Sequence, residues 1–304
     1  MSSKSRSKSP GKPVEKDSSK PPSGASFDLS PDEETEVEES LPPRVQVLHE
    51  SIRLQGEDEL NRSVAALGWS ALAAGLSMGF SMLARALLKV HLPEASGWFL
   101  VENFGYTIGF LIVILARQQL FTENTITAVL PLMTVPGLRN ATRLLRLWGI
   151  VLVGNLVGVA LFAYGVGHMQ IVDEPLRSTI TGLGVEIMHN TPWQMFTKGI
   201  VAGWLIATMV WLLPSAGSSK AMIILLVTYL IGIGGFTHII VGSTEILFLV
   251  FEGKMSLVGY VADFAWPTLA GNVVGGSVIF ALISHAQVRS DSGKPPSQLL
   301  KDKE

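Results

Sequence analysis

Cysteine is absent from the 304 residues of this chain. Disulfides, thiolate metal sites and cysteine nucleophiles are therefore excluded. Charged residues are also scarce, at 16% of the chain, and most of them lie in residues 1–60 and 289–304. The sequence has no Ser/His/Asp grouping, no phosphate-cradling loop and no metal-ligand cluster. We therefore expect a protein that is not an enzyme, carries no cofactor or metal, and does not bind nucleic acid.

Between the charged ends, the chain consists of long apolar segments. A bilayer core of about 30 Å is crossed by a helix of about 20 apolar residues. Six segments come close to that length: 64–90, 98–116 with a continuation to 133, 144–168, 195–213, 221–251 and 265–286. We predict an all-α membrane protein with a six-helix transmembrane domain at 61–288, in which the second and fifth helices are interrupted.

The two ends differ in kind from the centre. Residues 1–40 are rich in Ser, Lys, Pro and Glu and have almost no apolar side chains, so they cannot bury enough surface to offset chain entropy. We predict a disordered tail over 1–60, apart from residues 44–60, whose mixture of apolar and charged side chains favours an amphipathic helix at the membrane surface. Residues 289–304 are predicted to be a second, short tail.

Positive charge near the span ends predicts the orientation, because Lys and Arg concentrate in loops that face the cytoplasm. With six spans, one side of the membrane carries Arg53, Arg62, Arg139, Arg143, Arg146, Lys220, Arg289 and Lys294, and the other carries most of the acidic side chains. We expect a multi-pass protein of the cytoplasmic (inner) membrane, embedded in the lipid bilayer, with both termini in the cytoplasm. Three spans per half then enter the bilayer from opposite sides.

Two short motifs occur twice in the chain. Leu120-Phe121-Thr122 is echoed by Gly235-Phe236-Thr237 at an offset of 115 residues. Gly154-Asn155-Leu156-Val157-Gly158 is echoed by Gly271-Asn272-Val273-Val274-Gly275 at an offset of 117. Because the two offsets nearly agree, we interpret the echoes as traces of a duplicated half, which predicts an inverted repeat.

In each half, a polar or glycine-rich stretch interrupts an apolar segment, at 117–124 and at 232–238. A broken helix at membrane depth is tolerated only where it lines a cavity or is buried in protein. Such paired interruptions are the best sequence indication of a transport site, and half-helices there direct their positive dipole ends towards an anion. His238 is the only histidine deep within an apolar segment.

At these motifs the sequence resembles the formate/nitrite transporter family. The matching motifs are Leu120-Phe121-Thr122, Gly154 to Gly158, Lys198-Gly199-Ile200 running to Trp211, Gly235-Phe236-x-His238 and Gly271 to Gly276. They occur in order over about residues 64–287. The resemblance implies an aquaporin-like fold of six helices in two inverted three-helix repeats, a homopentamer with one pore per protomer, and passage of small monocarboxylate or nitrite-like anions.

The resemblance also implies roles for single residues. Thr122 and His238 would face each other at the narrowest polar point, and Lys198 would gather anions in the outer vestibule. An interfacial lysine that extends its ammonium into water is the alternative for Lys198. Tyr106, one helical turn before Phe110, either presents an aromatic face above the first break or packs in the core.

The other residues of the breaks also have two interpretations. His238 either relays a proton for a weak acid or bonds a carbonyl at the break as a structural side chain. Thr122 and Thr237 either bond the solute through their hydroxyls or bond back to their own helices. Phe121 and Phe236 are either hydrophobic gates or packing residues between helices.

Four residues are expected to be structural. Asn155 and Asn272 lie in Gly-x-x-x-Gly frames, which let helices approach closely, and their amides suit the freed backbone groups of the breaks. Gly234 and Gly235 belong to the second break itself.

The sequence departs from the family pattern around His238. Thr237 stands where the family usually has an acidic residue, and Gly203 and Gly242 stand where it usually has asparagine. Glu245, two helical turns after His238, partly replaces the missing acid if the chain is helical there.

These departures leave three functions open. The first is a conduit for a small weak-acid anion, passive or proton-linked through His238. The second is a pore for a small neutral solute, widened by Gly203 and Gly242. The third is a membrane protein that transports nothing and serves as an interaction platform.

Overall fold

The computed structural model describes residues 30, 32–33, 36–37, 41, 43–93 and 97–292. The predicted tail at 1–40 and most of the tail at 289–304 lie outside these residues. Residues Met1–Pro42 and Pro43–Glu304 are separate compact units, and the second one carries all the predicted spans. In the first unit, the amide and the hydroxyl of Ser30 both donate to the Glu33 carboxylate at 2.8 Å.

All regular elements in the described part of the chain are helical. The α-helices are α2 (Val45–Asn61), α3 (Val64–His91), α4 (Trp98–Glu102), α5 (Thr107–Leu115), α6 (Asn124–Thr127), α7 (Val129–Thr134), α8 (Leu138–His168), α9 (Glu174–Met188), α10 (Pro192–Leu212), α11 (Lys220–Ile233), α12 (Ile239–Phe251), α13 (Leu257–Gly259), α14 (Trp266–Val273) and α15 (Leu282–Ser292). Short 3-10 turns, η1 (Leu213–Ser215) and η2 (Gly217–Ser219), join α10 to α11. Two π-helical stretches, η3 (Tyr260–Ala265) and η4 (Val274–Ala281), continue the helix from α13 to α15.

Five helical stretches of the described residues are long and apolar enough to cross a membrane: Val64–His91, Trp98–Leu115, Leu138–His168, Pro192–Ser215 and Leu257–Ser290. The remaining predicted span consists of two shorter apolar helices, α11 and α12, which are separated by residues 234–238. The second span is interrupted as well, because residues 116–123 lie between α5 and α6. The two predicted interruptions are therefore present.

Helix α9 is a feature that the apolar pattern did not predict. At 15 residues it is too short to cross a bilayer, and it connects the third span to the fourth. Asp173 caps its first turn by accepting from the Leu176 amide at 3.1 Å, and its inner face buries Ile180 and Leu183. This helix brings Glu186, near its end, to the wall of the cavity described below.

The two Gly-Asn-x-x-Gly motifs have the same packing role in the two halves. A Cβ at Gly158 of α8 would overlap the carbonyl oxygen of Leu72 in α3. A Cβ at Gly275 in the last span would overlap the carbonyl oxygen of Ile200 in α10. The small residues thus let two pairs of helices pack backbone against backbone.

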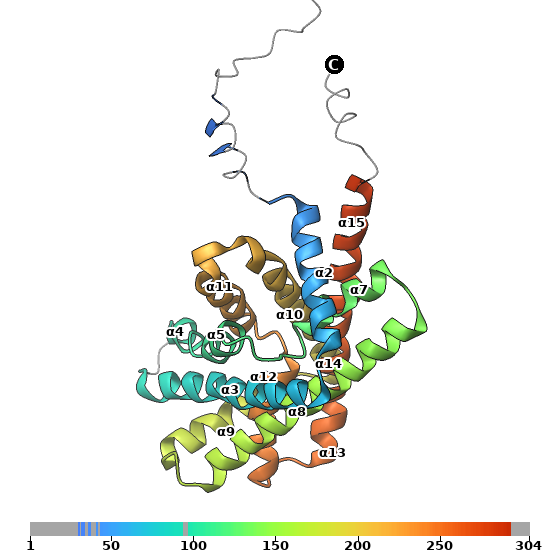
Figure 1. The fold of residues 1–304 in the computed structure, drawn as a ribbon. Helices are drawn as coiled ribbons and strands as arrows, with labels where there is room; N and C mark the ends of the chain where they lie inside the picture. The colour runs from blue at the N-terminus through green and yellow to red at the C-terminus, as the bar shows by residue number, and fades with distance from the viewer. Residues whose placement is uncertain are drawn as a thin grey trace, which may run out of the picture. The chain divides into compact units, whose positions relative to one another are not determined.

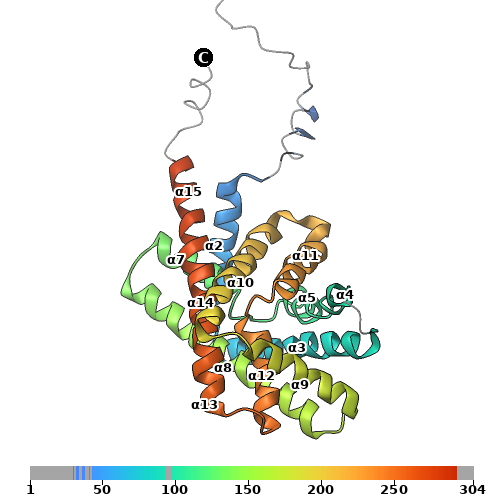
Figure 2. The same ribbon diagram turned by 180° about the vertical axis from the view of Figure 1, so that it is seen from behind.

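Helix α2 spans the region predicted to be an amphipathic helix. Its buried face contains Ile52, Gly56 and Leu60, and a Cβ at Gly56 would overlap the carbonyl oxygen of Thr127. Figures 1 and 2 show α2 beside α15, where His49 bonds His285 at 3.0 Å. One face of α2 therefore packs against protein, and contact of its other face with a membrane stays a prediction.

Candidate functional site

The first break is held by the side chain of Asn155 in α8. Its Oδ1 accepts from the Phe121 amide at 2.9 Å, and its Nδ2 donates to the carbonyls of Gln119 and Ala71, both at 2.8 Å. Asn155 is fully buried. Backbone groups left unpaired by the end of a helix at this depth thus find a partner within the protein.

Asn272 holds the second break in the same way. Its Oδ1 accepts from the Ile239 amide at 2.9 Å, and its Nδ2 donates to the carbonyls of Thr237 and Gly199 at 3.0 and 2.9 Å. Within the break, Gly235 has a positive φ of 57°, a conformation that glycine adopts without strain.

The bonds of the two asparagines define which residues of the two halves are equivalent. Gln119 corresponds to Thr237 and Phe121 to Ile239, at an offset of 118 residues. The echo of Leu120-Phe121-Thr122 in Gly235-Phe236-Thr237, at an offset of 115, is therefore not a structural equivalence. The position that matches His238 in the first half is Leu120.

His238 bonds Thr122 across the two breaks. Nε2 of His238 lies 2.8 Å from Oγ1 of Thr122, and the two residues are 2% and 1% exposed. Nδ1 of His238 accepts from the amides of Ile240 and Val241, at 3.3 and 3.4 Å, and so caps α12. Because Nδ1 is an acceptor, the neutral imidazole carries its hydrogen on Nε2 and donates it to Thr122. The hydroxyl hydrogen of Thr122 is then left for another acceptor.

Aromatic rings surround this pair. The ring of Phe110 lies edge-on to His238, with centroids 5.1 Å apart, and Tyr106 packs beside Phe110 at 5.5 Å. Phe121 turns towards Trp148, with centroids 5.7 Å apart. The Thr122–His238 bond therefore lies in an apolar environment, where a hydrogen bond is stronger than in water.

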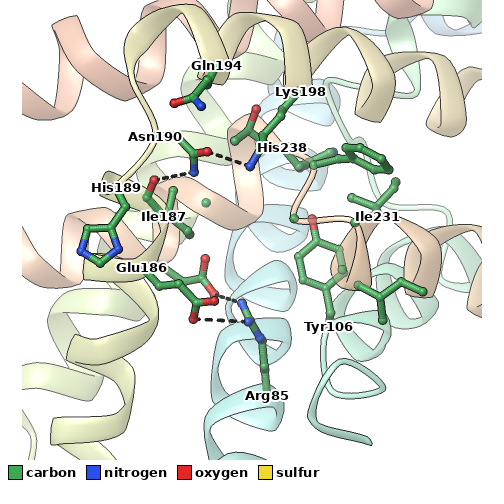
Figure 3. A pocket seen from close by; sticks show the side chains of 18 of the residues that line it. Arg85, Tyr106, Glu186, Ile187, His189, Asn190, Gln194, Lys198, Ile231 and His238 are labelled. Atoms are coloured by element: carbon green, nitrogen blue, oxygen red, sulfur yellow. Dashed lines mark hydrogen bonds and ion pairs between the residues drawn. The ribbon is translucent and has the colours of Figure 1, made fainter. Parts of the chain in front are cut away.

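A cavity of about 340 Å³ reaches His238, and we call it the His238 cavity. Figure 3 shows its side chains. Of the residues predicted to line a pore, Tyr106, Lys198, Phe236, Thr237 and His238 line it, together with Gly234 and Gly235. Phe121 and Thr122 are not among its lining residues. Phe121 thus lies away from this cavity, and Thr122 contacts it only through His238.

Two of the lining residues make bonds that limit their possible roles. The hydroxyl of Thr237 donates to the Met195 carbonyl at 2.7 Å, so its hydrogen is not available to a solute. The bond of Thr237 to the solute stays a prediction, in which its oxygen is the atom left to accept. The ammonium of Lys198 donates to Oδ1 of Asn190 at 2.7 Å, which holds a positive charge at the cavity wall.

Gly203 and Gly242 do not widen the site. A Cβ at Gly203 would overlap the backbone of Asn272, so this glycine allows α10 to approach α14. At Gly242 a Cβ would lie 2.5 Å from the ring of Phe264, which is fully buried and fills the space. The expectation of a pore enlarged by these two glycines is wrong.

The sequence interpretation missed a cluster of charges at the cavity, which we call the Arg85 cluster. It contains Arg85 and Lys89 of α3, Glu102 of α4, Glu186 of α9 and Glu245 of α12. The signal available was a single arginine well inside an apolar segment, since an ionisable residue within a span is by default functional. As α12 is helical from Ile239 onwards, Glu245 does reach the cavity that His238 lines.

Comparison with known proteins identifies the family. The family model described as formate/nitrite transporter matches residues 46–286. The chain belongs to the formate/nitrite transporter family. It is 54% identical over 254 residues to the inner membrane protein YfdC of Escherichia coli (strain K12), covering 84% of this chain and 82% of that protein. It is 24% identical to the formate channel FocA of Haemophilus influenzae, covering 59% of this chain and 70% of that protein.

Solved structures share the fold. An FNT family ion channel matches 82% of this chain and 99% of its own, with a TM-score of 0.69 and 19% identity. A pentameric formate channel with formate bound matches 72% of this chain and 95% of its own, with a TM-score of 0.62 and 19% identity. The predicted family and the predicted fold, six membrane helices in two inverted repeats, are confirmed. This formate/nitrite transporter family member is a multi-pass membrane channel or transporter.

Proposed function

We propose that this protein conducts small monovalent weak-acid anions, such as formate or nitrite, along a path that runs through the His238 cavity and past Thr122. The observation that carries the proposal is the 2.8 Å bond between Thr122 and His238, which joins the two helix breaks. One relative is named a formate channel and one structural neighbour holds formate, which supports this substrate class.

The geometry suits an anion that leaves water. His238 donates to Thr122, and Thr122 can donate its own hydroxyl to an oxygen of the solute, so the two act as a chain of donors. Such a donor replaces part of the hydration shell that the anion loses. Lys198, held by Asn190 at the cavity wall, favours the arrival of negative charge. A role of His238 in moving a proton together with the anion is part of the same proposal.

The assembly and orientation are proposals too. A pentameric structural neighbour supports a homopentamer with one path per protomer, and the name of the E. coli relative supports the inner membrane. Arg143 bonds Oδ1 of Asn61 and Arg146 bonds the carbonyl of Leu60, both at 2.7 Å. These basic residues therefore lie at the same end as α2, which supports a cytoplasmic location for that end and for both termini.

Flux into proteoliposomes tests the function. We expect uptake of radiolabelled formate or nitrite, lowered about tenfold or more in His238→Ala and Thr122→Ala, because each variant removes a buried hydrogen bond along the path. The matched controls are His91→Ala and Thr142→Ala, which change histidine and threonine side chains at exposed positions. Uptake that is absent from the parent protein, or equal in all variants, would overturn the proposal.

A further inference from the structure

Arg85 is a charged residue within the first span, and its side chain is 10% exposed. Figure 3 shows its guanidinium pointing into the His238 cavity, beside Tyr106 and Glu186. Glu245 lines the same cavity and is 2% exposed. Keeping two such groups away from water is costly unless they have partners or a function.

Within the described part of the chain, the partners of Arg85 are all carboxylates. Its Nη2 donates to Oε1 of Glu102 at 3.1 Å and lies 3.8 Å from Oε2 of Glu186. Its Nη1 lies 3.8 Å from Oε1 of Glu245, a distance too long for a hydrogen bond. The pairing of Arg85 with Glu245 is therefore looser than its pairing with Glu102.

The charges of the Arg85 cluster do not balance. Lys89 adds a second cation, which lies 3.6 Å from Glu102 and 3.7 Å from Glu186. Three carboxylates then face two cations, so the cluster carries one excess negative charge when all three carboxylates are ionised. A bare anion that approaches Arg85 meets repulsion as well as attraction.

Two polar atoms of this pair have no hydrogen-bond partner among the described residues. They are Nε of Arg85, a donor, and Oε1 of Glu245, an acceptor. Both are buried and belong to side chains that line the cavity. A buried donor and a buried acceptor that lack partners destabilise the protein, so a solute that satisfies both is favoured.

We propose that Arg85 and Glu245 form a second binding site in the His238 cavity, for a small planar solute that carries a carbonyl oxygen beside an O–H or N–H group. The carbonyl oxygen accepts from Nε of Arg85, and the O–H or N–H group donates to Oε1 of Glu245. An undissociated monocarboxylic acid has this arrangement, and a primary amide has it at every pH. A bare anion offers acceptors only. The inference rests on the proposed function, because it treats the cavity as part of the conduction path.

Three probes with three non-hydrogen atoms each separate these chemistries: formate, formamide and thiocyanate. Uptake of radiolabelled formate into proteoliposomes is measured with an excess of unlabelled formamide or thiocyanate outside. We expect formamide to inhibit the parent protein more strongly than thiocyanate does. In Glu245→Gln, we expect inhibition by formamide to weaken at least about fivefold and inhibition by thiocyanate to strengthen, because the anionic acceptor is replaced by a weaker neutral amide and the negative charge is lost.

Arg85→Lys tests whether the guanidinium does more than balance charge. Lysine keeps the positive charge but has no Nε–H placed along its stem, so we expect formamide inhibition to weaken at least about fivefold. Full inhibition by formamide in this variant would assign Arg85 a purely structural role. Glu252→Gln is the matched control, since Glu252 pairs with Arg177 at 2.8 Å and does not line the cavity. The melting temperatures of all variants in detergent show whether they fold.

Binding of formamide alone distinguishes the failure of this site from the failure of the proposed function. Saturation-transfer NMR on the detergent-solubilised protein is expected to give a clear formamide signal with the parent and a much weaker one with Glu245→Gln, whose neutral amide is a poorer acceptor. If formate is not transported but this difference appears, the proposed function fails and the binding site stands. If formate uptake depends on His238 while neither inhibition nor NMR responds to Glu245→Gln, the binding site is overturned and the proposed function stands.

Discussion

Leu120 and His238 occupy equivalent positions in the two halves of the molecule. In the first half, Asn155 bonds the carbonyl before Leu120 and the amide after it. In the second half, Asn272 bonds the carbonyl before His238 and the amide after it. The scaffold around the two positions is thus nearly symmetric, while their chemistry differs. The side chain of leucine cannot form a hydrogen bond. The polar contact between the breaks therefore comes from His238 and from Thr122, two residues after Leu120.

The capping role of His238 can be separated from its bond to Thr122. Asparagine is a good N-cap but is too short to reach Thr122, so we expect His238→Asn to melt close to the parent temperature and to lose about tenfold or more of its anion flux. His238→Leu, which copies the first half, is expected to lose both the flux and about 1 kcal/mol from the missing cap. Flux and thermal melting on the same preparations check this. Parent-like flux in His238→Asn would show that the Thr122 contact is dispensable.

Asn272 is expected to contribute more to stability than a surface asparagine. Asn272→Ala leaves the Thr237 carbonyl and the Ile239 amide of the second break without this partner in the interior, at about 1–3 kcal/mol each, and removes a bond to the Gly199 carbonyl of α10. We expect a loss of about 3 kcal/mol or more, seen as a lower melting temperature in detergent, and a similar loss for Asn155→Ala. Asn140→Ala, which removes two side-chain bonds at the half-buried first turn of α8, is the control. Equal melting temperatures for Asn272→Ala, Asn155→Ala and Asn140→Ala would contradict this account.

Gly242 and Phe264 are expected to be energetically coupled. A methyl group at 242 overlaps the Phe264 ring, so Gly242→Ala is expected to cost about 1–3 kcal/mol by overpacking. Phe264→Leu alone leaves a cavity, and the double variant is expected to be more stable than the sum of the two single changes predicts. A double-mutant cycle of melting temperatures measures the coupling, and strict additivity would argue against the contact.

The contact of α2 with α15 is expected to weaken in acid. Burial, reinforced by the neighbouring His285, lowers the pKa of His49 below its usual value near 6.5. The unfolded chain then binds the proton more readily than the folded one, so the contribution of neutral His49 is complete above about pH 6.5 and is lost as the pH falls through the lower folded pKa. Hydrogen exchange of α2 at pH 8 and pH 5 measures this, with His49→Gln expected to flatten the difference. The same pH dependence in that variant would exclude His49 as its source.

Much of the fold could be predicted from local patterns. Apolar run lengths identified the spans, and the glycine and polar interruptions identified both breaks, because unpaired backbone groups are not tolerated in lipid. Helix α9 was not predicted, because a 15-residue amphipathic segment is too short to be recognised as a span. The repeated Phe-Thr motif indicated the duplication but predicted the wrong alignment of the two halves. Two short motifs can match in sequence without occupying equivalent positions in the structure.

The sequence by itself determined the class of protein, the six spans, the two breaks and the family, since these depend on residue types along the chain. Only the tertiary structure decided which side chains meet. It brings Thr122 to His238, directs the hydroxyl of Thr237 to Met195, fills the space at Gly242 with Phe264 and collects Arg85 and Glu245 at one cavity. These contacts join residues far apart in the chain, and their geometry depends on how the helices pack, which no local pattern records.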